Sequence, residues 1–289
     1  MTDTIAFIGL GNMGGPMSAL LVAAGYRVQG FDPAAPARQA LADAGGTAVA
    51  TLSDAVQGAS VIVLMLPNSD IVAATVHDPG FEAPPGTTVI DMSSSEPMRT
   101  RELAAELADR GITLLDAPVS GGVARARTGK LTIMAGGEQA DLDRVAPVLA
   151  CLGTVTRAGA VGSGHAVKAL NNLLSATHLL VTCEAILAGE RFGLDAETML
   201  SIFNSSSGRS GSTENKWPNF ILPGSYDSGF GLRLMLKDMR IATGLADQLG
   251  APDPLGQASA ELWARAAEEL EPTADHTEIV NWLRKDHSR

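Results

Sequence analysis

The sequence predicts a doubly wound α/β domain with a mostly parallel sheet, joined by a long helix to an all-α C-terminal domain. Two observations lead to this prediction. The first half of the chain alternates short β-branched, apolar runs with helical stretches, a pattern typical of parallel sheets covered by helices on both faces. Beyond residue 160 the strand pattern stops, and one helical run from 164 to about 192 is followed only by further helix patterns.

The elements of the first half follow one another in a βα order. TIAFIGL (4–10) is the first expected strand, GPMSALLVAAGY (15–26) the helix after it, and RVQGFD (27–32) the second strand. Helical patterns at 98–111 and 141–153 lie among the later strands. Those strands are expected at 59–67, 86–93, 112–120, 129–137 and 153–159.

The second half contains helix patterns at 195–205, 229–250, 254–270 and 276–286. A Ser/Gly-rich loop, NSSSGRSGS (204–212), interrupts them. We therefore expect a sheet domain over 1–162, a long interdomain helix over 163–192 and an all-helical domain over 193–289.

Composition excludes several classes of partner. The 289 residues are 45% hydrophobic and only 4% aromatic, and the formal net charge is −11. An acidic chain has no basic surface for nucleic acid or for an anionic membrane, so neither is expected as a partner. No signal peptide and no apolar run of bilayer-spanning length is recognised, which predicts a soluble, cytoplasmic protein.

Cysteine and histidine spacing predicts no metal site. Cys151 and Cys183 lie in apolar contexts outside any CxxC or zinc spacing, so both are expected to be buried free thiols. The five histidines are scattered without an HxxxH or HExxH arrangement, and we expect no bound metal.

A glycine-rich turn links the first strand to the first helix. Gly9, Gly11 and Gly14 have the G-x-G-x-x-G spacing, in which the glycines permit a tight turn, approach of a pyrophosphate and close helix packing. This strand–turn–helix context predicts a dinucleotide-binding Rossmann domain. Asp32 follows 23 residues after Gly9, where a carboxylate would bind an adenosine ribose and repel a 2′-phosphate, so NAD is favoured over NADP. The alternative is that Asp32 only starts a turn before Pro33.

Three further strand ends are expected at the ligand crevice of such a sheet. They are Leu66–Pro67, DMSSSEP (91–97) and DAPVSGG (116–122). Within the last, Ser120, Gly121 and Gly122 could offer backbone N–H groups and a hydroxyl to a small carboxylate, or could form an ordinary turn.

A lysine stands among small apolar residues near the start of the long helix. Lys168 and Asn172 are four residues apart in GSGHAVKALNN (162–172) and so share one helix face. A solvated lysine is the simpler interpretation. A nicotinamide enzyme, however, needs a proton donor for the oxygen that becomes an alkoxide when hydride arrives, and a desolvated lysine could serve in both directions.

Several motifs in the same order resemble the β-hydroxyacid dehydrogenase family, which includes 3-hydroxyisobutyrate dehydrogenase and tartronate semialdehyde reductase. They are FIGLGNMG (7–14), DMS (91–93), DAPVSGG (116–122), GSGHAVKALNN (162–172), SSGR (206–209) and LMLKDMRIA (234–242). The resemblance covers nearly the whole chain. It implies a 6-phosphogluconate dehydrogenase type of NAD-binding domain and a helical domain through which members form homodimers or homotetramers.

The resemblance also implies roles for individual residues. Lys168 would be the catalytic acid/base, and Asn172 would bind substrate or hold the lysine. The substrate carboxylate would bind at Ser120, Gly121 and Gly122. The cofactor would contact Gly9, Leu10, Gly11, Asn12, Met13, Gly14, Asp32, Leu66, Pro67, Ser94 and Lys237.

The substrate follows less directly from the sequence. GGVARARTG (121–129) resembles the 3-hydroxyisobutyrate branch, whereas the segments around 171–185 and 216–230 depart from it. The first expectation is NAD-dependent oxidation of a small 3-hydroxy acid, best 3-hydroxyisobutyrate, to its semialdehyde. One alternative is reduction of tartronate semialdehyde or another aldehyde acid, including a sulfonate, for which Arg125 and Arg127 could bind a second anionic group unless they are merely solvated.

Two further alternatives lie outside hydroxy-acid chemistry. Imine reduction uses the same scaffold but typically lacks the lysine, so Lys168 argues against it. A non-catalytic Rossmann module for binding or oligomerisation would have little reason to retain Lys168, Asn172 and all three glycines together.

Overall fold

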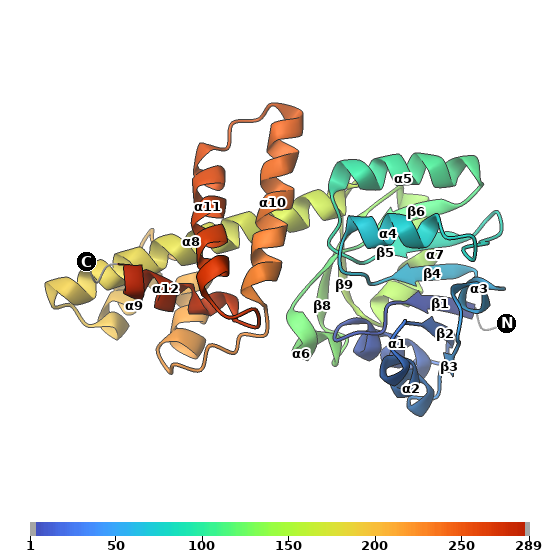
Figure 1. The fold of residues 1–289 in the computed structure, drawn as a ribbon, viewed down its shortest axis with the longest axis horizontal. Coiled ribbons are helices and arrows are strands. Elements are labelled where there is room, and N and C mark those ends of the chain that lie inside the picture. The colour runs from blue at the N-terminus through green and yellow to red at the C-terminus, as the bar shows by residue number, and fades with distance from the viewer. Residues whose placement is uncertain (1–3, 287–289) are drawn as a thin grey trace. The chain divides into compact units, whose positions relative to one another are not determined.

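The computed structural model describes residues 4–286 (Figure 1). The chain divides into two compact units, Met1–Lys168 and Ala169–Arg289, and the division falls inside the helix predicted over 163–192. A sheet with helices forms the first unit, and the second unit is built from helices.

A nine-stranded sheet forms the centre of the first unit, in the spatial order β3-β2-β1-β4-β5-β6-β8-β7, with β9 paired to β8. All pairs from β3 to β6 are parallel, whereas β8 is antiparallel to β6 and β7 and parallel to β9. The predicted mostly parallel, doubly wound sheet is therefore confirmed. Its strands are β1 (Thr4–Ile8), β2 (Arg27–Phe31), β3 (Thr47–Ala48), β4 (Val61–Leu64), β5 (Thr88–Asp91), β6 (Thr113–Asp116), β7 (Val119–Ser120), β8 (Leu131–Gly136) and β9 (Gly153–Gly159).

Helices cover both faces of this sheet because its central strands are apolar on both sides. Ile5 and Phe7 of β1 face α1, α2, α6 and α7, and the intervening Ala6 and Ile8 face α3, α4 and α5. The strand order reverses between β1 and β4, which marks the point where ligands bind in open α/β sheets. The helices are α1 (Gly14–Ala23), α2 (Ala35–Asp43), α3 (Leu52–Val56), α4 (Ser69–Val76), α5 (Pro97–Asp109), α6 (Gly122–Ala126) and α7 (Gln139–Ala150).

The single strand expected over 112–120 is in fact two. β6 ends at Asp116, and the chain turns at Ala117–Pro118 before β7 pairs antiparallel with β8. Pro118 has no N–H to continue the parallel ladder, so the turn occurs there. The short helix α6, which includes Arg125, was not predicted.

The second unit packs its helices around three tryptophans. Trp217, Trp263 and Trp282 are the three tryptophans of the chain, and each is at most 1% exposed. Segment η1, a π-helix, was not predicted; Pro218 inside it cannot donate to a regular helical ladder. The elements are α8 (Ser163–Phe192), which begins in the first unit, then α9 (Ala196–Asn204), η1 (Ser212–Ile221), α10 (Leu232–Leu249), α11 (Pro254–Glu269), the 3₁₀ turn η2 (His276–Glu278) and α12 (Ile279–Asp286).

Two sequence expectations need correction. Helix α8 does contain an 18-residue window, of mean hydropathy 1.3, that is long and apolar enough to cross a membrane by length and composition. Ala176, Leu179 and Cys183 on one of its faces are buried in the core of the second unit, whereas Leu174 and Val181 are exposed. Cys151, expected to be buried, is half-exposed where α7 ends, whereas Cys183 is fully buried.

Candidate active site

The turn between β1 and α1 has the shape that a dinucleotide phosphate requires. Gly9 has a φ of 93°, and a Cβ there would collide with the carbonyl oxygen of Met65. A Cβ at Gly14 would likewise collide with the carbonyl oxygen of Gly9, so α1 packs as closely as the motif predicts. A Cβ at Gly11 would meet no atom within 4 Å, which leaves the backbone there open to a ligand. These residues therefore fit a bound pyrophosphate at the N-terminus of α1.

Asp32 follows β2 and is engaged with the same turn. Its Oδ2 accepts a hydrogen bond of 2.8 Å from the Leu10 N–H, and its Oδ1 accepts one of 2.8 Å from the Ala34 N–H. The carboxylate thus both starts the turn and holds the glycine loop. Arg38, which the sequence analysis missed, donates from Nη1 to the carbonyl oxygens of Asp32 and Pro33. The guanidinium group of Arg38 therefore lies against the backbone of the residue expected to select the ribose.

The residues that follow the neighbouring strands β4 and β5 are joined by a hydrogen bond. The N–H of Leu66, after β4, donates to Ser93 Oγ, after β5, at 2.9 Å. Because β1, β4 and β5 are adjacent and parallel, Leu66–Pro67 and Ser94 lie at the same sheet edge as the glycine turn. The first unit thus brings together most of the predicted cofactor contacts.

The predicted carboxylate-binding residues lie where β7 meets α6. Ser120 ends β7, and Gly121 and Gly122 have φ values of 128° and 66° at the start of the helix. A Cβ at Gly121 would collide with the side chain of Arg125, which is itself exposed. Arg127 is exposed as well.

Lys168 is buried near the start of α8, with an exposed fraction of 6%. This contradicts the simpler expectation of a solvated lysine. The helix start is fixed by Asp116, whose Oδ1 accepts from the Gly162 N–H at 2.6 Å and whose Oδ2 accepts from the His165 N–H at 2.9 Å. A carboxylate that accepts N–H groups at a helix N-terminus is favoured by the helix dipole as well. Asp116 is therefore turned inward, and not toward a ligand.

Asn172 lies on α8 in the second unit and has a partner that the sequence analysis missed. Its Nδ2 donates to Oδ2 of Asp238 at 2.6 Å, and both side chains are buried. Lys237 Nζ lies 3.4 Å from the other carboxylate oxygen of Asp238. One buried carboxylate thus connects the expected substrate contact Asn172 with the expected cofactor contact Lys237. Asp238 follows Lys237 in the motif LMLKDMRIA, but its contact with Asn172 is made only in the folded chain and is not visible in the sequence.

A second lysine lies partly buried in the second unit. Lys216 Nζ donates to Ser175 Oγ at 2.7 Å, and burial lowers the pKa of this amine to about 8. Burial, together with the positive charge of Lys216, also lowers the pKa of His276 to about 4. Lys216 begins the segment 216–230, in which no individual charge was singled out from the sequence.

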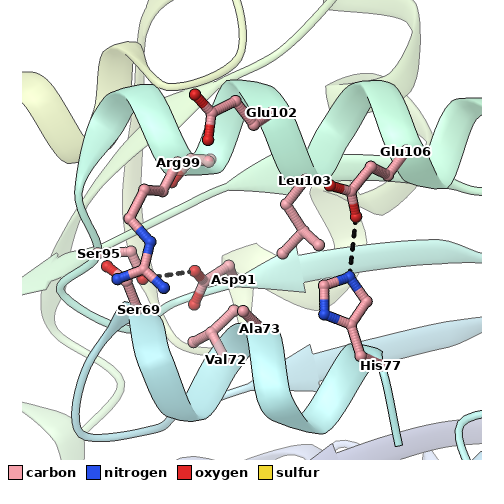
Figure 2. A pocket seen from close by; sticks show the side chains of 11 residues that line it. Ser69, Val72, Ala73, His77, Asp91, Ser95, Arg99, Glu102, Leu103 and Glu106 are labelled. Carbon is pink, nitrogen blue, oxygen red and sulfur yellow. Dashed lines mark hydrogen bonds and ion pairs between the residues drawn. The ribbon is translucent and has the colours of Figure 1, made fainter.

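A hollow of about 170 Å³ lies between α4 and α5 in the first unit, and none of the predicted site residues lines it. Figure 2 shows Val72, Ala73 and Leu103 lining it beside the ion pair of His77 and Glu106. Asp91 and Ser95 border it at the other end, joined by a hydrogen bond of 2.7 Å from Ser95 Oγ to Asp91 Oδ2.

Comparison with known proteins covers both units. Residues 4–162 match the family of the NAD binding domain of 6-phosphogluconate dehydrogenase, and residues 162–283 match the NAD-binding family of NADP-dependent 3-hydroxyisobutyrate dehydrogenase. The chain is 39% identical to an NAD-dependent L-serine dehydrogenase of Pseudomonas aeruginosa, over 90% of each chain. It is 34% identical to a 3-sulfolactaldehyde reductase of Escherichia coli, over 97% of this chain and 95% of that one.

A solved structure is similar over the same extent. It is the 3-hydroxyisobutyrate dehydrogenase of Mycobacterium tuberculosis with L-serine, with a TM-score of 0.94 and 35% identity. The match covers 98% of this chain and 100% of that one.

Proposed function

The chain belongs to the 3-hydroxyisobutyrate dehydrogenase family of β-hydroxyacid dehydrogenases, and from this premise we propose that it oxidises a small 3-hydroxy acid with NAD. It is an NAD(P)-dependent oxidoreductase. The first substrate to test is 3-hydroxyisobutyrate, whose product would be the semialdehyde. The observation that carries this proposal is the buried Lys168 on a helix start that Asp116 holds in place.

Lys168 supplies the acid/base group of the proposed reaction. A bound nicotinamide cofactor would supply the hydride acceptor for oxidation, or the hydride donor for reduction, at the carbon that carries the oxygen. The Lys168 amine takes the hydroxyl proton during oxidation and gives it back during reduction. Asn172, whose amide nitrogen donates to Asp238, is the proposed second contact of the substrate, and Ser120 with the N–H groups of Gly121 and Gly122 would bind the substrate carboxylate.

Asp32 supports NAD as the cofactor. Its carboxylate would accept the ribose hydroxyls and repel a 2′-phosphate, although Arg38, which donates to the backbone carbonyl oxygen of Asp32, offers a positive charge. We expect Asp32→Ser to lower the ratio of kcat/KM for NAD to that for NADP by about tenfold, since one carboxylate–ligand interaction is removed. Steady-state kinetics with both cofactors measures this ratio, and an unchanged ratio would show that Asp32 only shapes the turn.

The relatives support a set of substrates to compare. The similar proteins are named for L-serine, 3-sulfolactaldehyde and 3-hydroxyisobutyrate, which all carry an anionic group near an alcohol or aldehyde. Reduction of an aldehyde acid is therefore the second candidate. The exposed Arg125 and Arg127 favour it only if the substrate carries a second anionic group.

The test is a substrate panel with the purified protein. NAD would be combined with 3-hydroxyisobutyrate, 3-hydroxypropionate, glycerate, L-serine, L-threonine and threonate. NADH would be combined with 3-sulfolactaldehyde and with the semialdehydes that correspond to the primary alcohols of this set. Absorbance of NADH is the readout. A kcat/KM on the order of 10,000 M⁻¹s⁻¹ or more for one compound would identify the substrate. No turnover in either direction, with NAD still bound, would favour the non-catalytic module.

A further inference from the structure

His165 lies fully inside the first unit, three residues before Lys168. Its side chain is 1% exposed, and both ring nitrogens have partners. Nδ1 lies 2.8 Å from Thr100 Oγ1 on α5, and Nε2 lies 3.1 Å from the carbonyl oxygen of Ser93 after β5. Because a carbonyl oxygen can only accept, Nε2 carries a proton and donates to Ser93.

The surroundings of the ring are charged and equally buried. Asp91 Oδ2 lies 3.7 Å from Nε2, and Asp116 Oδ2 lies 4.0 Å from Nδ1. Asp91 accepts from the Ser93 N–H and from Ser95 Oγ, and Asp116 accepts from the first turn of α8. A buried polar network whose members are all paired is rigid, and it specifies one arrangement of the elements that meet in it.

Ser93 connects this network to the expected cofactor contacts. Its carbonyl oxygen accepts from His165, and its Oγ accepts from the Leu66 N–H. Ser94, the next residue, is an expected cofactor contact, as is Leu66 itself. A continuous chain of bonds therefore runs from these contacts through Ser93 to His165.

The same histidine is fixed to the helix that carries the lysine. Residues three apart on a helix lie on neighbouring positions of one face, and the rise between them is about 4.5 Å. The backbone of His165 is held by Asp116, and its ring is held by Ser93 and Thr100. His165 thus gives the start of α8, which carries Lys168, a direct hydrogen bond to the loop after β5.

We propose that His165 is a positioning residue, which fixes Lys168 relative to the cofactor-contacting loop through its hydrogen bond to the Ser93 carbonyl oxygen. The proposal rests on the proposed function, because it concerns the proton-transferring role of Lys168. Displacement of a catalytic group by about 1 Å can cost 100-fold in rate, so loss of this bond should slow the chemical step.

Two substitutions distinguish the effect of losing the hydrogen bond to Ser93 from the effect of losing the imidazole ring. The amide nitrogen of His165→Gln reaches the position of Nε2 and can still donate to Ser93, whereas that of His165→Asn reaches only the position of Nδ1, toward Thr100. We expect H165Q to keep kcat within about threefold of the wild type and H165N to lower it by about 10- to 100-fold. Thr100→Val, which removes the Nδ1 partner, should behave like H165Q.

Two readouts distinguish positioning from a general loss of structure. Hydride transfer from a substrate deuterated at the carbinol carbon should show a larger isotope effect on kcat in H165N than in H165Q, because the chemical step has become slower. Hydrogen–deuterium exchange of residues 163–170 in the cofactor-free protein should accelerate in H165N and stay as in the wild type in H165Q. If H165N does not fold, His165→Met fills the same space without a donor and takes its place.

The outcomes separate this inference from the proposed function. If the wild type turns over no compound of the panel, the proposed function fails, and the exchange measurement alone decides about His165. Equal kcat and equal exchange in H165Q and H165N, whether both normal or both impaired, would overturn the role of the Ser93 bond. A loss in H165N alone would support it.

Discussion

Buried polar groups are fully paired at the start of α8, where Asp116 and His165 lie. They are poorly paired in a second region, around Lys216 and His276 of the second unit. At the helix start both oxygens of Asp116 accept N–H groups, and both ring nitrogens of His165 have partners. In the second unit, by contrast, Lys216 has a hydroxyl partner and forms no ion pair within residues 4–286, and Nε2 of His276 is buried without a partner. Paired buried groups fix geometry, whereas poorly paired ones lower stability. We therefore expect substitutions in the first region to impair function or folding and a substitution in the second to stabilise the protein.

The largest effect is expected at Lys168 itself. Lys168→Ala removes the acid/base group, so kcat should fall by about 100- to 10,000-fold, the range for general acid/base catalysis. Binding of NADH, measured by its fluorescence, should change little because the expected cofactor contacts lie elsewhere. As a control, Lys130→Ala removes an exposed lysine of the first unit and should leave kcat unchanged. Near-normal turnover of K168A would disprove the proposed role.

The next largest effect concerns the stability of the first unit. Asp116→Ala leaves the N–H groups of Gly162 and His165 buried without an acceptor, and we expect a loss of about 2 to 4 kcal/mol in the free energy of unfolding. Urea unfolding followed by circular dichroism measures it. Tryptophan fluorescence reports on the second unit alone, because all three tryptophans lie there. Asp109→Ala, at the exposed end of α5, is the control; an equally small shift in both variants would mean that Asp116 does not hold the helix start.

A smaller effect is expected at Asp238, a buried carboxylate of the second unit that is paired much as Asp116 is in the first unit. Asp238 accepts a short hydrogen bond from Asn172 and lies beside Lys237. Asp238→Ala should lower kcat/KM by about 10- to 100-fold, since a hydrogen bond to a charged group contributes about 1.5 to 3 kcal/mol. Asp238→Asn keeps an acceptor for Asn172 but loses the charge beside Lys237, so its loss should be smaller. If the two variants lose equally, the charge and not the bond to Asn172 is responsible.

The candidate site residues differ in how far the sequence predicts them. The glycine turn, Asp32 and the strand ends are local features, because each lies at the end of a strand whose periodicity is visible. The roles of Asp116 and His165 depend on β6 and α5 packing against the start of α8, and the pairing of Asn172 with Asp238 spans 66 residues. No periodicity or spacing contains such contacts. The π-helix η1 was missed for a related reason, since Pro218 disfavours a regular helix and packing of Trp217 compensates.

The smallest effect, and the one of opposite sign, is expected at Lys216. Burial lowers the pKa of this amine from 10.5 to about 8, so between these pH values the unfolded chain binds more protons than the folded one, and the wild type becomes more stable as pH rises. Lys216→Met keeps the apolar stem and removes the charge, and it should raise the free energy of unfolding at pH 7 by about 1 to 2 kcal/mol, with the gain disappearing by about pH 10.5. Urea unfolding followed by tryptophan fluorescence measures this at pH 7 and pH 10, with Lys130→Met as the exposed control. A destabilised K216M would mean that the hydrogen bond to Ser175 outweighs the cost of burying the charge, and that the second region is as well paired as the first. A gain that does not change with pH would mean that it comes from apolar packing of the methionine and not from removal of the buried charge.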